Sequence, residues 1–329
     1  MKAQRSAKPG ETAAGHPDDR ERLQGEADFW DARAESLRAS GRIPLWFDHR
    51  RGEDVSFIPL HELKGAGIRA NPVLYRAVYG ALIDRILAVA TARKGNALDL
   101  GCGAGWFSLE LARCGLSVDG FDISPGQIDI AARMSKESEE SADPRLHGDF
   151  GRTNYRVADL NAIRLEKAKY DVVVSLGTLH HIKRLDYLLG EIGPSLKPGG
   201  KFIFWEYIGY RGLARVFPAL FKTAGAIAAP ARWIGGRAVP SRTSPFEGIS
   251  QAEILEAVRR EFLIESLESR FLFLPVLVSR LRIYRLPRTL GLPVTRILAG
   301  VDGGLIRSRL FQGPFILGVA AARKPAPRS

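Results

Sequence analysis

A strand, turn and helix signature near residue 100 constrains this chain more than any other feature. The apolar run 97–100 ends in glycines at alternate positions, Gly101, Gly103 and Gly105, and helical spacing follows over 106–113. Glycine is needed where the backbone takes a positive φ or where a ligand lies directly against it. The next helix offers unpaired N–H groups to an anionic group. The sequence therefore predicts an α/β unit whose loop receives a ligand.

The spacing of the glycines limits which ligand fits. A dinucleotide fingerprint has the spacing G-x-G-x-x-G, because the pyrophosphate must reach the helix N-terminus. Here the spacing is G-x-G-x-G, and Asp99 precedes it at the end of the strand. An acid at this place suits a ligand that carries an amine. A glycine-rich turn also serves close helix-strand packing in many α/β proteins, so the loop alone leaves both interpretations open.

The segment Leu98-Asp-Leu-Gly-Cys-Gly-Ala-Gly105 resembles the first motif of class I S-adenosylmethionine-dependent methyltransferases. The turn Lys197-Pro-Gly-Gly200, which feeds an aromatic strand, is a second hallmark of that family. The resemblance covers residues 96–207 well and 250–322 weakly. It implies a doubly wound, Rossmann-like α/β fold with a seven-stranded sheet and helices on both faces. It also implies S-adenosylmethionine as the cofactor, with the loop holding its amino-carboxypropyl tail.

The strand ends and the resemblance together predict the cofactor-binding residues. Asp122 closes a second strand 23 positions after Asp99, where nucleotide-binding units keep a carboxylate for the ribose hydroxyls. Ser124 is the better cap for the next helix, which leaves Asp122 for the ribose. Asp159, in a third strand over 155–160, matches the acid that contacts the adenine amine in this family. The predicted set is Asp99, Gly101, Cys102, Gly103, Gly105, Asp122, Ile123, Asp159, Leu160, Ser175 and Leu176.

Two adjacent histidines follow a fourth strand, which is expected over 170–174. Ligands of doubly wound sheets bind beyond the carboxyl ends of the strands, so His180 and His181 should face the cofactor cleft. If the acceptor atom is a hydroxyl oxygen, an imidazole is the natural proton acceptor. His181, His180 and Glu206, at the end of the fifth strand, are therefore the candidate catalytic residues. A paired histidine also serves packing or helix capping, and this alternative stays open.

Composition excludes two kinds of site. Cys102 and Cys114 are the only cysteines, too few for a disulfide framework or a Cys-based zinc site. We expect both to be structural residues in a reducing compartment. Adjacent histidines cannot readily share one metal, and no acid cluster accompanies them, so we expect no metal.

Charge and hydropathy indicate the compartment and the class of partner. No apolar segment reaches the roughly 18 residues that a membrane span needs without a charge or a proline, and the N-terminus is not signal-like. We therefore expect a cytoplasmic protein. The net charge of +12 favours anionic partners such as phospholipid, phosphorylated substrate or nucleic acid. Nucleic acid is the least favoured, because the fourth strand lacks the Asn/Asp-Pro-Pro-Tyr/Phe motif of base-modifying methyltransferases.

The chain divides into three predicted regions. Residues 1–25 lack periodicity and are expected to form a disordered tail. Residues 26–95 hold amphipathic helices over 27–40 and 72–89, which either cover the cofactor or pack on the core. Residues 96–325 form the methyltransferase domain. Its other expected elements are a helix over 125–134, a loop over 135–152, a helix over 185–192, strands over 201–207, 261–271 and 315–321, and a helix over 250–260.

Two insertions at about 208–248 and 272–312 combine apolar residues with an excess of arginine. Long insertions beside an active site are commonly lids, so we expect a helical cap. Its apolar residues either form their own core or, with the arginines, give peripheral contact with the anionic inner face of a membrane.

These observations predict an enzyme that transfers a methyl group from S-adenosylmethionine to a small or lipid-like acceptor, with oxygen as the favoured acceptor atom. Two alternatives stay open. One is a non-catalytic S-adenosylmethionine-binding module, and the other is a nicotinamide-dependent oxidoreductase on a similar sheet. The glycine spacing and the turn at Lys197 argue against the oxidoreductase. The sequence does not indicate the oligomeric state.

Overall fold

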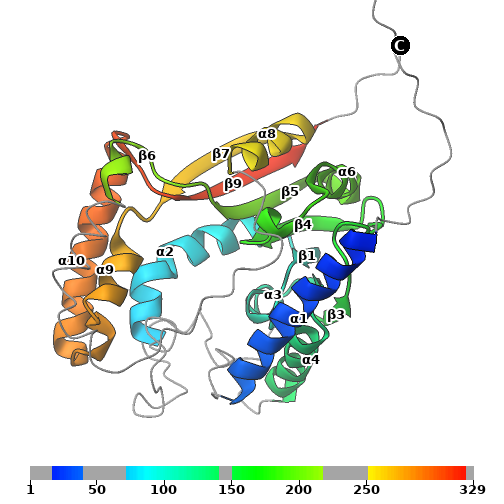
Figure 1. Ribbon diagram of the computed structural model, residues 1–329, viewed down its shortest axis with the longest axis horizontal. Coiled ribbons are helices and arrows are strands. Elements are labelled where there is room, and N and C mark those ends of the chain that lie inside the picture. The colour runs from blue at the N-terminus through cyan, green and yellow to red at the C-terminus, as the bar shows by residue number, and fades with distance from the viewer. Residues whose placement is uncertain (1–16, 40–71, 141–149, 218–250, 324–329) are drawn as a thin grey trace, which may run out of the picture.

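The computed structural model describes residues 17–39, 72–140, 150–217 and 251–323, and Figure 1 shows their arrangement. The N-terminal half contains α1 (Pro17–Ala39), α2 (Pro72–Ala90), β1 (Asn96–Leu100), α3 (Trp106–Arg113), β2 (Ser117–Asp122), α4 (Pro125–Glu140) and β3 (Thr153–Val157). Next come β4 (Tyr170–Leu176), η3 (Leu179–His181), α6 (Leu185–Ser195), β5 (Leu196–Tyr207), β6 (Arg211–Gly212) and η4 (Leu213–Val216). The last elements are α8 (Gln251–Glu261), β7 (Phe262–Arg270), α9 (Leu274–Arg280), η6 (Ile283–Arg285), α10 (Arg288–Arg307), β8 (Phe311–Gln312) and β9 (Phe315–Ala322).

The central sheet has seven strands in the order β3-β2-β1-β4-β5-β9-β7. The pairs from β3 through β5 are parallel, whereas β9 is antiparallel to both of its neighbours. The strand order reverses between β1 and β4, and ligands of doubly wound sheets bind beyond the carboxyl ends of strands at such a point. The predicted seven-stranded, doubly wound fold is confirmed.

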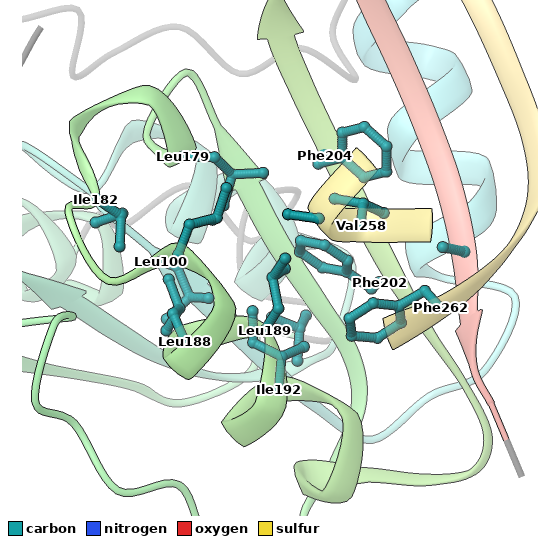
Figure 2. Packing of buried hydrophobic residues seen from close by; sticks show 14 of the residues in the cluster. Leu100, Leu179, Ile182, Leu188, Leu189, Ile192, Phe202, Phe204, Val258 and Phe262 are labelled. Carbon is teal, nitrogen blue, oxygen red and sulfur yellow. The ribbon is translucent and has the colours of Figure 1, made fainter. Parts of the chain in front are cut away.

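Alternating side chains of the strands bury both faces of the sheet. Leu98 and Leu100 of β1 join a core cluster that includes side chains of α6 and α8. Figure 2 shows Leu100 of β1 in this cluster with Leu188 and Leu189 of α6 and Phe202 of β5. On the opposite face, Ala97 belongs to a second cluster with α2, α3 and α9. Helices therefore cover both faces, because both sets of alternating residues are apolar.

Helix α1 lies outside these two layers and packs along α4 (Figure 1). A small cluster joins them, in which Ala34 of α1 meets Ile130 and Met134 of α4 and Leu109 of α3. The helix therefore rests on the elements that follow the glycine-rich loop and β2, close to the carboxyl ends of the strands.

The second insertion forms the expected helical cap. Helix α10 packs against α2 and α9 at one end of the molecule (Figure 1). Asp302 of α10 is buried, and its carboxylate accepts hydrogen bonds from the backbone N–H groups of Leu272, Phe273 and Leu274 at the start of α9. The first insertion contributes β6 and η4, and its residues 218–248 lie outside the described ranges.

Of the described helices, α10 alone is long and apolar enough to cross a bilayer by length and composition. Its 18-residue apolar window has a mean hydropathy of 1.2, and 22% of the window is buried. The helix contains Pro293, Arg296 and Asp302, so the sequence rule that excluded a span without a charge or a proline still holds.

Four predicted boundaries are wrong. Helix α1 begins at Pro17, so the expected disordered tail is contradicted at 17–25, and residues 1–16 lie outside the described part of the chain. Proline at the first helical position followed by acids favours the start of a helix. The prediction missed this start because it relied on apolar periodicity, which the segment lacks. Helix α4 continues to Glu140 through residues predicted as a loop, because the hydroxyl of Ser135 is buried against that of Thr153 in β3. Strand β3 starts and ends earlier than predicted. Strand β5 begins at Leu196 and so includes the residues predicted as the Lys197-Pro-Gly-Gly200 turn.

Candidate active site

The glycine-rich loop after β1 has the backbone that the sequence predicts. Gly101, Gly103 and Gly105 have φ angles of 69°, 52° and 77°, in the left-handed region that favours glycine. A Cβ atom at Gly101 would lie 2.2 Å from the hydroxyl of Thr178, and one at Gly105 would lie 2.7 Å from the Cβ of Ala131. These two glycines therefore also serve close packing.

Gly103 differs from its neighbours because its open side faces no protein backbone. The nearest atom to an added Cβ is Oε1 of Gln127, at 3.9 Å. That oxygen is buried and has no hydrogen-bond partner among the described residues. A buried acceptor without a partner is expensive, and an amine or hydroxyl of a ligand would satisfy it. Gly103 and Gln127 thus form a side of the loop that has room for a ligand and an acceptor for its donor group.

Asp99 lies under this loop as a buried carboxyl group. Burial is the largest cause that raises its pKa from 3.8 to about 7, the negative charge of Asp122 raises it further, and the hydrogen bond from the Ser108 hydroxyl at 2.7 Å opposes the shift. A cationic group of a ligand would favour the ionised form of Asp99. The predicted acid therefore lies where it suits an amine.

Asp122 connects the end of β2 to the glycine-rich loop. Its two oxygens accept hydrogen bonds from the backbone N–H groups of Gly103 and Ser124, both at 2.9 Å. Burial raises its pKa, and the charge of Asp31 in α1 adds to the shift. Ser124 is the helix cap that the sequence predicts, since its hydroxyl accepts from the N–H of Gln127 at 3.0 Å. The ribose role of Asp122 remains a prediction.

The remaining predicted cofactor residues lie in different environments. Asp159 follows β3 in a loop, where its Oδ1 accepts hydrogen bonds from the backbone and side-chain nitrogens of Asn161. Leu160 is buried in the core cluster with α6, whereas Ile123 is half-buried after β2. Cys102 is buried in the loop, and burial raises the pKa of its thiol, as expected for a structural cysteine. The cofactor contacts of these residues stay predictions.

The end of β4 brings Ser175 and Leu176 close to the glycine-rich loop. The two strands pair so that Leu100 lies opposite Ser175, and Thr178 packs against Gly101. Ser175 is fully buried, and its hydroxyl has no hydrogen-bond partner within the described part of the chain. The predicted loop and the predicted histidine segment therefore meet at the reversal of the strand order.

His180 and His181 lie in the short helix η3, beside Glu206 of β5. The Nδ1 atom of His180 lies 2.8 Å from Oε2 of Glu206, and Oε1 of Glu206 accepts a hydrogen bond from the backbone N–H of Leu179 at 2.7 Å. Glu206 is buried, and both of its oxygens are engaged. This geometry suits a group that orients His180 better than one that takes a proton from a ligand.

Helix α1 adds site residues that the sequence did not identify. Glu26 is buried, and its Oε1 lies 3.3 Å from Nδ1 of His181. Trp30 places its ring edge-on to His181, with 5.6 Å between the ring centroids. Asp31 contacts the start of α4. The sequence offered one signal for these residues, since Glu26 and Trp30 are four positions apart and therefore share one face of a helix. That spacing does not indicate which part of the protein the face contacts.

Within the described ranges, no three His, Cys, Asp or Glu side chains gather as the ligands of a metal ion would. The acids of the site are distributed differently. Asp122 lies between the other two acids, because its charge raises the pKa of Asp99 and the charge of Asp31 raises the pKa of Asp122. Such a group of carboxyls, beside the open face of Gly103 and the unsatisfied oxygen of Gln127, fits a ligand that carries ammonium and sulfonium charges.

The same region is recognised by comparison with known proteins. A family model described as "Methyltransferase domain" matches residues 98–204. The sterol 4-C-methyltransferase strm-1 of Caenorhabditis elegans is 33% identical over 113 residues, which cover 34% of this chain and 31% of that protein. A ubiquinone biosynthesis O-methyltransferase of Coxiella burnetii is 26% identical over 114 residues, or 35% of this chain and 44% of that protein. The match thus spans less than half the length of these curated relatives.

Solved structures with a similar fold extend over most of the chain. The geranyl diphosphate C-methyltransferase of Streptomyces coelicolor A3(2) has a TM-score of 0.53 at 16% identity, over 95% of this chain and 100% of that one. The cyclase SpnF has a TM-score of 0.51 at 18% identity, over 93% and 97% of the two chains. At these identities the likeness concerns the fold alone.

The family match spans the glycine-rich loop, Asp122, the histidines and most of β5, which are the parts that assemble the site. The predicted methyltransferase family, with its enzyme class and its cofactor, is supported for this region of the chain. Over residues 98–204 the chain is similar to the class I S-adenosylmethionine-dependent methyltransferases, and this region matches their methyltransferase domain.

Proposed function

We propose that this protein transfers a methyl group to a small, lipid-like acceptor, with oxygen as the acceptor atom. One observation carries the proposal: two imidazoles, each with Nδ1 against a buried carboxylate, lie beyond β4 next to the glycine-rich loop. The relatives' names supply the acceptor class, since one is a sterol methyltransferase and another an O-methyltransferase of ubiquinone biosynthesis. Both names refer to lipid-like molecules.

The residues of the site have separate tasks in this proposal. Bound S-adenosylmethionine supplies a methyl group that its sulfonium already activates, so the protein must orient the acceptor and exclude water. Asp99, Asp122 and Asp159 bind the cofactor. As the oxygen-methyl bond forms and the methyl-sulfur bond breaks, the acceptor hydroxyl loses its proton. His181, or else His180, accepts that proton at Nε2, because Nδ1 faces a carboxylate in both residues.

A methyl-labelling experiment tests this proposal. The purified protein is incubated with S-adenosylmethionine labelled at the methyl group and with extract of the source cell, which is then divided into lipid, small-molecule and macromolecular fractions. We expect label in the lipid fraction, and much less after His181→Gln together with His180→Gln. Label confined to macromolecules contradicts the acceptor class.

A second candidate is a domain that binds S-adenosylmethionine without transferring its methyl group. This candidate is kept because the cyclase SpnF has a similar fold, while its name describes a reaction other than methyl transfer. The same experiment separates the two. A protein that binds the cofactor but labels none of the fractions supports the binding module.

We also propose that the protein is cytoplasmic and contacts the anionic inner face of a membrane through α10. The outward side chains Leu290, Ile297 and Val301 are 55%, 67% and 51% exposed, and their spacing places them along one stripe of the helix. The segment 272–312 contains seven arginines and one acid, Asp302, which is buried. An apolar stripe within a basic segment fits an anionic bilayer surface.

Helix α10 is proposed to lie on the membrane and not to cross it. One side of the helix packs on α2 and α9, and crossing the bilayer would break this packing. Arg296 and Asp302 would also enter the hydrocarbon layer, which costs several kcal/mol.

Sedimentation with two kinds of vesicle tests this contact: neutral vesicles, and vesicles that also contain the anionic lipid phosphatidylglycerol. We expect binding to anionic vesicles only, weaker at higher salt, and reduced about fivefold by Arg307→Gln because one basic residue near the surface contributes about 1 kcal/mol. Ile297→Ser should also reduce it. The matched controls are Leu263→Ser on β7, where Leu263 is 59% exposed, and Arg133→Gln on α4. Equal losses in the controls, or a dimer that Ile297→Ser dissociates, contradict the proposal.

A further inference from the structure

Helix α1 carries a buried carboxylate, Glu26, which is not one of the predicted cofactor-binding residues. Glu26 is only 3% exposed, and a buried ionised carboxylate is costly unless it is paired and hydrogen-bonded. Its Oε1 accepts a hydrogen bond from Nε1 of Trp30 at 2.7 Å and lies 3.3 Å from Nδ1 of His181. Glu26 therefore faces the histidine pair and not the solvent.

The two histidines have parallel arrangements. His180 presents Nδ1 to Glu206 of β5, and His181 presents Nδ1 to Glu26 of α1. Their rings lie 4.0 Å apart between centroids, and the edge of Trp30 packs against His181. A carboxylate at Nδ1 keeps the proton on that nitrogen and leaves Nε2 as an acceptor. Strand β5 thus provides the carboxylate for His180, and the N-terminal helix α1 provides the one for His181.

A second contact fixes the same helix to the cofactor side of the site. The carboxylate of Asp31 accepts hydrogen bonds from the backbone N–H of Gly126, at 2.8 Å, and from the hydroxyl of Ser124. Both groups follow Asp122 directly and begin α4. Because Glu26 and Asp31 lie on one helix, the docking of α1 joins the end of β2 to the histidine pair.

We infer that Glu26 is a positioning residue for His181 and that helix α1 is thereby a part of the active site. Glu26 holds the ring of His181 through Nδ1, keeps Nε2 unprotonated, and stabilises the imidazolium that forms when Nε2 accepts a proton. The use of that proton acceptor rests on the proposed methyl transfer, but the pairing itself does not.

The tautomer of His181 tests the pairing without an acceptor molecule. Long-range nitrogen-proton NMR spectra of protein with labelled histidine distinguish Nδ1–H from Nε2–H, and His181→Gln assigns the signal among the six histidines. We expect the Nδ1–H form in the wild type. Glu26→Gln retains an oxygen acceptor and should preserve it, whereas Glu26→Leu should abolish the preference. Glu21→Leu, an exposed change on the same helix, is the control.

Two outcomes overturn the inference. One is an Nε2–H tautomer in the wild type, which needs no variant and so does not depend on folding. The other is an unchanged tautomer in Glu26→Leu with the helical circular dichroism of the wild type. Among the described residues, Glu26, Trp30 and His180 contact His181, and Glu206 contacts His180, so all spectra should be recorded at the same pH.

Activity adds an independent readout once an acceptor has been labelled. We expect Glu26→Leu to lower kcat by about 10²-fold with little change in KM, since orienting a base affects the transition state and not acceptor binding. Glu26→Gln should recover part of kcat. Failure of methyl transfer in the wild type would contradict the proposed function and leave the tautomer result standing.

Discussion

Glycine is needed for different structural reasons at the three positions of the loop after β1. Gly101 and Gly105 have neighbours that a Cβ would strike, whereas Gly103 faces open space beside an unsatisfied oxygen of Gln127. A sequence motif treats the three positions alike. The open space lies at Gly103, so we expect replacement there to affect ligand binding more than packing.

At the residue scale, Asp99 should couple cofactor binding to pH. Burial raises its pKa to about 7, so the free protein holds a proton there at pH 6, and a bound cation favours the ionised form. Binding therefore releases a proton below that pKa. We expect S-adenosylmethionine affinity, measured by calorimetry, to rise about fivefold from pH 6 to pH 7.

Asp99→Asn removes the titrating group and should abolish most of this rise. Asp122 also has a raised pKa, and the variant separates the two carboxyls. An identical pH profile in the wild type and in Asp99→Asn would show that Asp99 stays ionised or lies away from the cation.

At the scale of elements, the cap depends on one buried acid. Asp302 of α10 accepts hydrogen bonds from three consecutive N–H groups at the start of α9, which have no partner within their own helix turn. The contact joins two cap helices that are otherwise held by apolar side chains. Because Asp302, the only acid in segment 272–312, is buried in this contact, it contributes little negative charge to the arginine-rich surface of the segment.

Asp302→Ala should therefore destabilise the protein strongly. Removing the carboxylate leaves several buried donors unpaired, and we expect a loss of about 2 to 4 kcal/mol in the free energy of unfolding by urea. The control Asp129→Ala lies on α4, where the carboxylate is exposed and paired with Arg133, and should cost under about 1 kcal/mol. Equal losses in the two variants would mean that Asp302 does not hold the cap.

Most strands and helices of the domain could be predicted because their signals are local. An apolar run such as 172–174 indicates a strand buried on both faces, and the glycine-rich loop fixes where β1 ends and α3 begins. Glu26 could not be assigned from sequence. Its partner, His181, lies 155 positions away, and the contact exists only because α1 docks on α4. Long-range docking of a polar helix leaves no local pattern.

At the scale of the whole molecule, three parts of the chain have different origins and tasks. The domain over 98–204 supplies the loop and the histidines, α1 adds Glu26 and Asp31, and the C-terminal insertion forms the cap beside α2. The family match explains the first part only. The positioning of His181 by α1 and the membrane contact of α10 are proposals about the other two.

Calorimetric titration with S-adenosylmethionine tests the central claim most directly, because the proposed methyl transfer depends on that ligand binding at Gly103. We expect saturable binding to the wild type and none to Gly103→Asn, since asparagine tolerates a positive φ while its side chain fills the open space. The control Gly115→Asn, at a φ of 89° just after α3, should bind like the wild type. Binding of a nicotinamide dinucleotide in place of S-adenosylmethionine, or equal binding by Gly103→Asn, would contradict the account.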